Sequence, residues 1–266
     1  MPETTIRHEV SGGIARVILA RPDVRNAFNA NVIAELFDLF KRIAAADDVR
    51  AVVLSGDGKV FCGGADINWM RESLDLSFEA NAIDAERMSD MFRAIDNCPH
   101  PVIGRIHGAA LGGGAGLAAV CDVVVSADDA LFGFTEVKLG IIPAVISPFV
   151  LSKIGASHAR ALFLTGERFS AQRAQHIGLV HEVVPEAQLD SAIDRILGEI
   201  LSAGPNAVSA AKLLVRRVLD ATYEETRGLT SQAIAKQRIG PEGQEGLRAF
   251  LERRKASFVD GGDAAK

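Results

Sequence analysis

Short apolar segments alternate with amphipathic segments along the first two thirds of the chain. Residues 14–20 (IARVILA) and 50–55 (RAVVLS) are rich in β-branched and aliphatic side chains, which is typical of buried strands. Residues 31–46 carry apolar side chains at helical spacing, at Ile33, Leu36, Phe37, Phe40 and Ile43. A strand, a helix and a continuously apolar strand in this order predict a parallel sheet that is covered on both faces.

Three later segments repeat the strand pattern. Residues 101–106, 123–126 and 179–184 are short and mostly apolar, with several valines and isoleucines. Together with the first two strands, they predict one α/β core domain over residues 1–200.

The end of the chain has a different pattern, in which helix follows helix. Beyond Pro185, the helical segments are separated by Gly204–Pro205 and by Gly240–Pro241, which are strong helix breakers. The apolar positions of this part exceed what one core easily covers. Residues 201–266 are therefore predicted to form a C-terminal helical oligomerisation region, which closes a homotrimer or homohexamer.

Composition and charge narrow the classes of function. Apolar residues make up 48% of the chain, and the formal net charge is −5 with scattered basic residues. No basic stripe is present, so we expect no nucleic acid as partner. No apolar run is long enough for a membrane span and no basic-then-apolar leader is seen, so we expect no membrane and a cytoplasmic location. Three cysteines without ligand spacing indicate neither a disulfide framework nor a metal site.

Two glycine clusters are the first candidates for chemistry. Residues 62–66 (CGGAD) and 112–116 (GGGAG) each lie between an expected strand and an expected helix. Neither cluster has the pattern of a phosphate-binding or dinucleotide-binding loop. Two such turns side by side would aim two backbone N–H groups at one oxygen, which is the requirement for an oxyanion hole. Tight packing turns between sheet and helices explain the same spacing, and spacing alone leaves both interpretations open.

Three longer motifs carry a resemblance that spans nearly the whole chain. They are residues 61–67 (FCGGADI), 107–122 (HGAALGGGAGLAAVCD) and 132–143 (FGFTEVKLGIIP), and residues 250–258 (FLERRKASF) follow as a final helix. In order and separation they resemble the enoyl-CoA hydratase/isomerase (crotonase) family. The resemblance implies an α/β spiral of ββα turns with a C-terminal helical trimerisation region, in which trimers often pair into hexamers.

The resemblance also implies roles for single residues around an acyl-CoA substrate. It assigns the two oxyanion-hole amides to Ala65 and Gly113. The backbone of Val24 and Arg25 is expected to lie along the CoA moiety. Ala65 is expected to contact CoA as well. No separate cofactor is expected, because coenzyme A is part of the substrate.

Four further positions match CoA contacts of the family. Asp66 and Ile67 correspond to residues on the adenine side. Phe250 and Arg253 correspond to residues that reach the CoA of a neighbouring subunit. For Arg253, a solvated helix face explains a basic residue equally well.

Only one of the two expected glutamates is present. Glu136 matches one of the two glutamates with which most hydratases of the family work, whereas the position of the other is Gly116. A carboxyl followed by apolar residues loses hydration, and its pKa rises toward the range that suits proton transfer near neutrality. One acid/base suffices to move a proton between C2 and C4, which is the logic of the family's Δ3,Δ2-enoyl-CoA isomerases.

Other segments favour hydration. Residues 64–70 (GADINWM) and 140–150 (GIIPAVISPFV) resemble a bacterial subgroup assigned to methylglutaconyl-CoA hydration in leucine degradation. The candidates for holding the attacking water are Glu136 acting twice, Asn68, His107 and a backbone group. The preferred reaction is hydration of a branched, methylglutaconyl-like 2-enoyl-CoA; the alternatives are isomerisation by Glu136 alone and a CoA-binding protein without turnover. Residues 69–87 are polar with mixed spacing, so the sequence does not indicate which of them face the acyl group.

Overall fold

The computed structural model describes residues 5–259, and its core is a six-stranded sheet. The strand order is β1-β2-β3-β4-β6-β9, with β1 antiparallel to β2 and all other neighbours parallel. The strands are β1 Ile6–Ser11, β2 Ile14–Leu19, β3 Ala51–Gly56, β4 Val102–Ile106, β6 Val123–Ala127 and β9 Glu182–Val184. The expected parallel sheet is confirmed.

Two details of this sheet differ from the sequence prediction. β1 was not expected, because its sequence IRHEVS is largely polar and only Ile6 is buried at this edge of the sheet. β9 begins at Glu182, later than expected, because Leu179 and Val180 end the preceding turn, where both amides donate to the Ala174 carbonyl. Burial of Leu179 and Val180 explains their apolar character without a strand.

A second sheet of three short strands lies beside the first. It consists of β5 Ala109–Leu111, β7 Leu131–Gly133 and β8 Arg168–Ser170, in the order β5-β7-β8. Strands of three residues are too short for an alternating pattern, so the sequence did not reveal them. This sheet fixes the segment after β5, which leads into the second glycine cluster.

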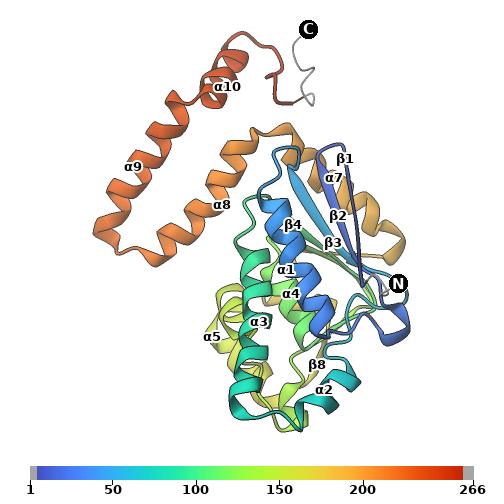
Figure 1. The fold of residues 1–266 in the computed structure, drawn as a ribbon. Helices are drawn as coiled ribbons and strands as arrows, with labels where there is room; N and C mark the ends of the chain where they lie inside the picture. The colour runs from blue at the N-terminus through green and yellow to red at the C-terminus, as the bar shows by residue number, and fades with distance from the viewer. Residues whose placement is uncertain (1–4, 260–266) are drawn as a thin grey trace.

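Helices cover the sheets (Figure 1). α1 Ala30–Ala44 confirms the amphipathic pattern, and it packs against α3 Phe78–Asp96. The other core helices are α2 Ile67–Ser73, α4 Gly113–Val120, α5 Ser147–Thr165, α6 Ala171–His176, α7 Leu189–Ser202 and the 3-10 helices Pro22–Val24, Glu136–Leu139 and Glu186–Gln188. Among residues 5–259, no helix combines the length and the apolar character that crossing a membrane requires.

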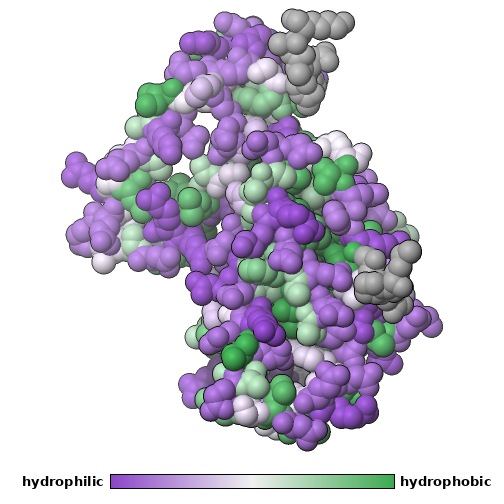
Figure 2. All heavy atoms as spheres, in the orientation of Figure 1, coloured by the Kyte–Doolittle hydropathy of each residue, from purple (hydrophilic) through white to green (hydrophobic). Residues whose placement is uncertain are grey.

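Three C-terminal helices form an arm that extends from the core (Figure 1). They are α8 Pro205–Asp220, α9 Tyr223–Ile239 and α10 Pro241–Leu251, so the expected breaks at Gly204–Pro205 and Gly240–Pro241 are confirmed. A further break at Thr222, which forms a capping box with Glu225, was not expected. Only Ala249 is buried in the three helices, and Figure 2 shows hydrophobic residues gathered on the arm.

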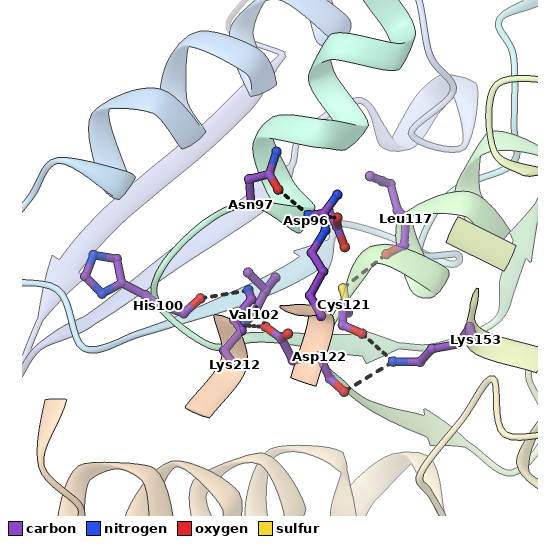
Figure 3. A network of polar contacts seen from close by, with 10 residues as sticks. Asp96, Asn97, His100, Val102, Leu117, Cys121, Asp122, Lys153 and Lys212 are labelled. Atoms are coloured by element: carbon purple, nitrogen blue, oxygen red, sulfur yellow. Dashed lines mark hydrogen bonds and ion pairs between the residues drawn. The ribbon is translucent and has the colours of Figure 1, made fainter. Parts of the chain in front are cut away.

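A polar network attaches the arm to the core (Figure 3). The Lys212 Nζ on α8 lies 2.7 Å from the Asp122 Oδ2, and the same oxygen accepts a 2.7 Å hydrogen bond from the Val102 amide at the start of β4. On the other side of this segment, the Lys153 Nζ donates to the Cys121 carbonyl at 2.6 Å. The network ties α8 to α4, β4 and α5 at one place.

Candidate active site

The two glycine clusters lie side by side because Cys62 pairs with the backbone of β5. The Cys62 amide donates to the Ala109 carbonyl, and the Leu111 amide donates to the Cys62 carbonyl, both at 3.0 Å. Gly113 then begins α4 so close to the Phe28 ring that a Cβ at this position would lie 2.7 Å from a ring carbon. Only glycine fits there, and the close approach brings the first turn of α4 against the first cluster.

The amides of Ala65 and Gly113 are both left without partners. The Phe28 amide donates to the Gly64 carbonyl and the Asp66 amide donates to the Phe28 carbonyl, both at 2.8 Å, so Phe28 uses the groups on either side of Ala65. The Ala65 N–H points away from this pairing. Gly113 is the first residue of α4, where an N–H has no partner within the helix. Neither amide makes a hydrogen bond to any residue within 5–259.

Both amides face one cavity of about 410 Å³. Its walls come from the two glycine clusters, α2, α3 and the segment from Glu136 to Ile146. Most of the lining is apolar, and the polar side chains on it belong to Ser73, Asn81, Asp84, Thr135 and Glu136. No lysine, arginine or histidine is among the described residues that line it. The cavity therefore suits an apolar acyl group with a polar centre at one end.

Glu136 lines this cavity beside the second glycine cluster. It begins the 3-10 helix Glu136–Leu139, and its Oε1 lies 3.4 Å from the position that a Cβ on Gly112 would occupy. Its Oε2 is buried and has no hydrogen-bond partner among the described residues. Burial raises the pKa of Glu136, and a hydrogen bond from its own backbone amide opposes that rise. The acid form of Glu136 therefore persists to a higher pH than that of an exposed glutamate.

Gly116 does not line the cavity, although it occupies the position where most hydratases carry the second glutamate. A Cβ on Gly116 would lie 2.4 Å from the Ile146 Cγ2 and 3.1 Å from the Phe92 Cζ. Ile146 itself lines the cavity. The side chain of Ile146 thus fills the space in front of Gly116, so the position matched to the second glutamate does not face the cavity.

The residues expected along CoA gather beside the first cluster. Arg25 adopts a left-handed conformation (φ 58°) at the end of the 3-10 helix that contains Val24, and its carbonyl accepts a 2.8 Å hydrogen bond from the Gly63 amide. Asp66 caps α2 and pairs with Arg21 at 2.8 Å, and its neighbour Ile67 is 70% exposed.

The Asp66 carboxyl is held by more than one donor. Burial acts to raise its pKa, yet the amides of Asn68 and Trp69 together with Arg21 bring the pKa below its usual value. A fixed, ionised Asp66 rigidifies the turn that presents the Ala65 amide.

Phe250 and Arg253 lie far from this site in the same chain. They belong to α10 and the turn after it, at the end of the molecule opposite α2 (Figure 1). Phe250 is 80% exposed. Within one chain these residues do not meet the cavity, so their expected role requires a neighbouring subunit and stays a prediction.

Two of the residues expected to hold the attacking water do not line the cavity. Two residues that the sequence did not indicate line it instead. The Asn68 side chain accepts a hydrogen bond from Arg71 at 2.9 Å, and the His107 Nε2 lies 2.9 Å from the Gly58 carbonyl oxygen. Neither lines the cavity, whereas Asp84 and Ile146 do. Ser77 caps α3 and marks where this helix begins, but the sequence does not indicate which residues of α3 line the cavity.

Comparisons with known proteins agree with this geometry. The family model described as enoyl-CoA hydratase/isomerase matches residues 9–261. The short-chain-enoyl-CoA hydratase of Clostridium acetobutylicum is 32% identical, over 93% of this chain and 94% of its own. A crystal structure of an enoyl-CoA hydratase from Shewanella pealeana superposes with a TM-score of 0.92 at 36% identity, and covers 95% of each chain. Pseudomonas aeruginosa AtuE gives a TM-score of 0.93 at 34% identity, over 96% of this chain and 99% of its own.

The chain belongs to the enoyl-CoA hydratase/isomerase family, and it is an enzyme of that family. Its α/β crotonase fold of ββα units with C-terminal helices is confirmed by the close structural matches. Identity of 32–36% to hydratases supports enoyl-CoA hydratase-type activity. The family implies an acyl-CoA as the substrate.

Proposed function

We propose that the chain hydrates a branched 2-enoyl-CoA whose acyl group carries no charge. The observation that carries the proposal is the meeting of two unpaired amides, of Ala65 and Gly113, with the buried carboxyl of Glu136 around one cavity. The two N–H groups hold the thioester oxygen, on which negative charge develops when water attacks C3. Because they are fixed by the bridge to Phe28 and by the start of α4, they need no reorganisation as the charge forms.

Glu136 supplies the proton to C2 in this proposal. Burial raises the pKa of this carboxyl and so favours its acid form, which suits a general acid. The CoA moiety is held by Val24, Arg25, Asp66 and Ile67, because these residues border the first glycine cluster and Val24 and Ile67 are exposed there.

The wall of the cavity favours an uncharged acyl group over a methylglutaconyl group. A terminal carboxylate on the acyl chain would meet Asp84 and Glu136 and no cation among the described lining residues. We expect kcat/KM for 3,5-dimethylhex-2-enoyl-CoA, in which an isopropyl group replaces that carboxylate, to exceed kcat/KM for 3-methylglutaconyl-CoA by about tenfold or more. Initial rates of hydration of the two shape-matched esters provide the measurement. A preference for the charged ester would contradict the uncharged acyl group.

Isomerisation by Glu136 alone is the second candidate. The side chain of Ile146 in front of Gly116 favours it, because the second glutamate of most hydratases has no counterpart there. Chromatography of products from a 3-enoyl-CoA and from the matching 2-enoyl-CoA separates the two reactions. Double-bond migration without any 3-hydroxyacyl-CoA would establish the isomerase and reject the hydratase.

We propose further that the arm assembles the chain into a trimer or a dimer of trimers. Large apolar side chains stay exposed on α8, α9 and α10, among them Leu219, Ile239 and Phe250. A surface of this kind marks an interface between subunits, and cyclic closure satisfies it without open ends.

The assembly is tested by sedimentation. Three or six copies are expected at micromolar concentration, and Leu219→Glu combined with Ile239→Glu should shift the population toward the monomer by placing charge in the interface. The matched control is Leu164→Glu, which changes an equally exposed apolar residue of the core at the end of α5. A wild-type monomer under these conditions would refute the assembly.

A further inference from the structure

Hydration needs a proton acceptor in addition to the proton donor Glu136. When water adds to C3, one group must take a proton from the water while another gives a proton to C2. Burial raises the pKa of Glu136 and so favours its acid form, which gives a proton and cannot take one at the same time. Gly116 has no carboxyl, and Ile146 fills the space before it.

Among the described lining residues, one other titratable side chain faces the cavity, and it is Asp84. The remaining polar side chains are not acid/base groups at neutral pH. Ser73 donates its hydroxyl to the Met70 carbonyl at 2.8 Å, and Asn81 donates to the carbonyls of Leu76 and Ser77 at 3.1 and 3.2 Å. These hydrogen bonds stabilise the turn between α2 and α3. Among the described residues of α2 and α3 that line the cavity, Asp84 is the only one with a carboxyl group.

Asp84 lies on the face of α3 that lines the cavity. Asp84, Ala85 and Met88 line the cavity from one face of the helix. The Met88 Cε lies 3.0 Å from the position of a Cβ on Gly113, so this face of α3 reaches the first turn of α4. Asp84 is one helical turn away, about 6 Å along the axis.

The carboxyl of Asp84 has no partner within the described part of the chain. It makes no hydrogen bond or ion pair there, although Arg87 stands three residues later on the same helix. The residue is half-buried and borders a smaller cavity between α1 and α3 as well. A half-buried carboxyl without a structural partner is free to bind water on its cavity side.

From this placement we propose that Asp84 holds the attacking water and accepts its proton, an assignment that rests on the hydratase function proposed above. The water oxygen forms a bond to C3, and the π electrons of C2=C3 move to the thioester oxygen between the amides of Ala65 and Gly113. The proton leaves the water for the Asp84 carboxylate. The enolate then collapses, C2 takes the proton of the Glu136 acid, and solvent returns the proton from Asp84 to Glu136.

The test is Asp84→Asn, which keeps the size of the side chain and removes the proton acceptor. Hydration of a 2-enoyl-CoA should lose about tenfold or more in kcat, with KM changed by less than about threefold, and the pH–rate profile should lose one limb. Asp84→Glu should recover part of kcat, because it restores a carboxylate as the proton acceptor, although on a longer side chain. Asp90→Asn is the matched control: it lies on the same helix, borders only the smaller cavity, and should keep wild-type rates.

The outcomes separate this inference from the proposed function. A wild-type enzyme that hydrates 2-enoyl-CoA and an Asp84→Asn variant that hydrates it equally well would overturn the role of Asp84 alone. A wild-type enzyme that moves the double bond of 3-enoyl-CoA but adds no water would overturn the hydratase, and the role of Asp84 with it. Equal losses in Asp84→Asn and Asp90→Asn would assign the effect to α3 as a whole and would likewise reject the proposal.

Discussion

Glu136→Gln should lower kcat for the chain's reaction by about a hundredfold or more while KM for the CoA ester changes little. Glutamine keeps the size of the side chain, and it removes the proton that moves to or from C2. The CoA contacts expected from Val24, Arg25 and Asp66 lie outside the reacting end, so binding should survive. Steady-state rates and isothermal titration with a CoA ester separate the two quantities.

The pH dependence of the wild-type rate supplies a second readout of Glu136. Burial raises its pKa, so the acid form persists to a higher pH than for an exposed glutamate. If Glu136 gives the proton to C2, hydration declines as the pH rises through that pKa. The matched control is Glu186→Gln, since Glu186 also begins a 3-10 helix, is exposed and does not line the cavity. Full activity of Glu136→Gln on every ester accepted by the wild type would remove Glu136 from the mechanism.

The sheet, the helix breaks and the two glycine turns were predictable because each follows from local chemistry. A continuously apolar segment such as residues 51–54 has to be buried on both faces, and that requirement leads directly to the parallel strand β3. Gly240–Pro241 ends one helix and begins the next whatever surrounds it. By contrast, the short strands β5, β7 and β8 exist because neighbouring backbone segments pair, and their own residues carry no period.

The acyl wall of the site was not predictable for a different reason. α3 has a weak amphipathic pattern in its first half, because Asp84 and Ala85 face a cavity and their neighbours face solvent. A wall of a cavity combines polar and apolar residues according to the ligand, and ligand chemistry leaves no helical period. Ile146 was missed because its importance depends on contact with Gly116, thirty residues earlier in the chain. Contacts of that kind appear only once the fold is known.

Gly116→Glu alone should reduce both folding and activity, because its side chain meets Ile146 before it reaches the cavity. Its Cβ would lie 2.4 Å from the Ile146 Cγ2, and α4 is buried along its whole length. Overpacking costs about 1–3 kcal/mol, and an unpaired buried carboxyl adds to that cost. We expect the melting temperature to fall by about 5 °C or more. Thermal unfolding and hydration of crotonyl-CoA are the measurements.

Ile146→Ala in the same chain should reverse much of this loss. It removes the Cγ2 at 2.4 Å and leaves the Cβ at 3.0 Å, which a small backbone shift accommodates. In the double variant the new carboxyl occupies the space of the Ile146 side chain, beside the cavity that Glu136 lines. Two carboxyls at the reacting end should then raise hydration of the small, unbranched crotonyl-CoA above that of Ile146→Ala alone, which serves as the control. A double variant that is no more stable and no more active than Gly116→Glu would show that Ile146 does not separate Gly116 from the cavity.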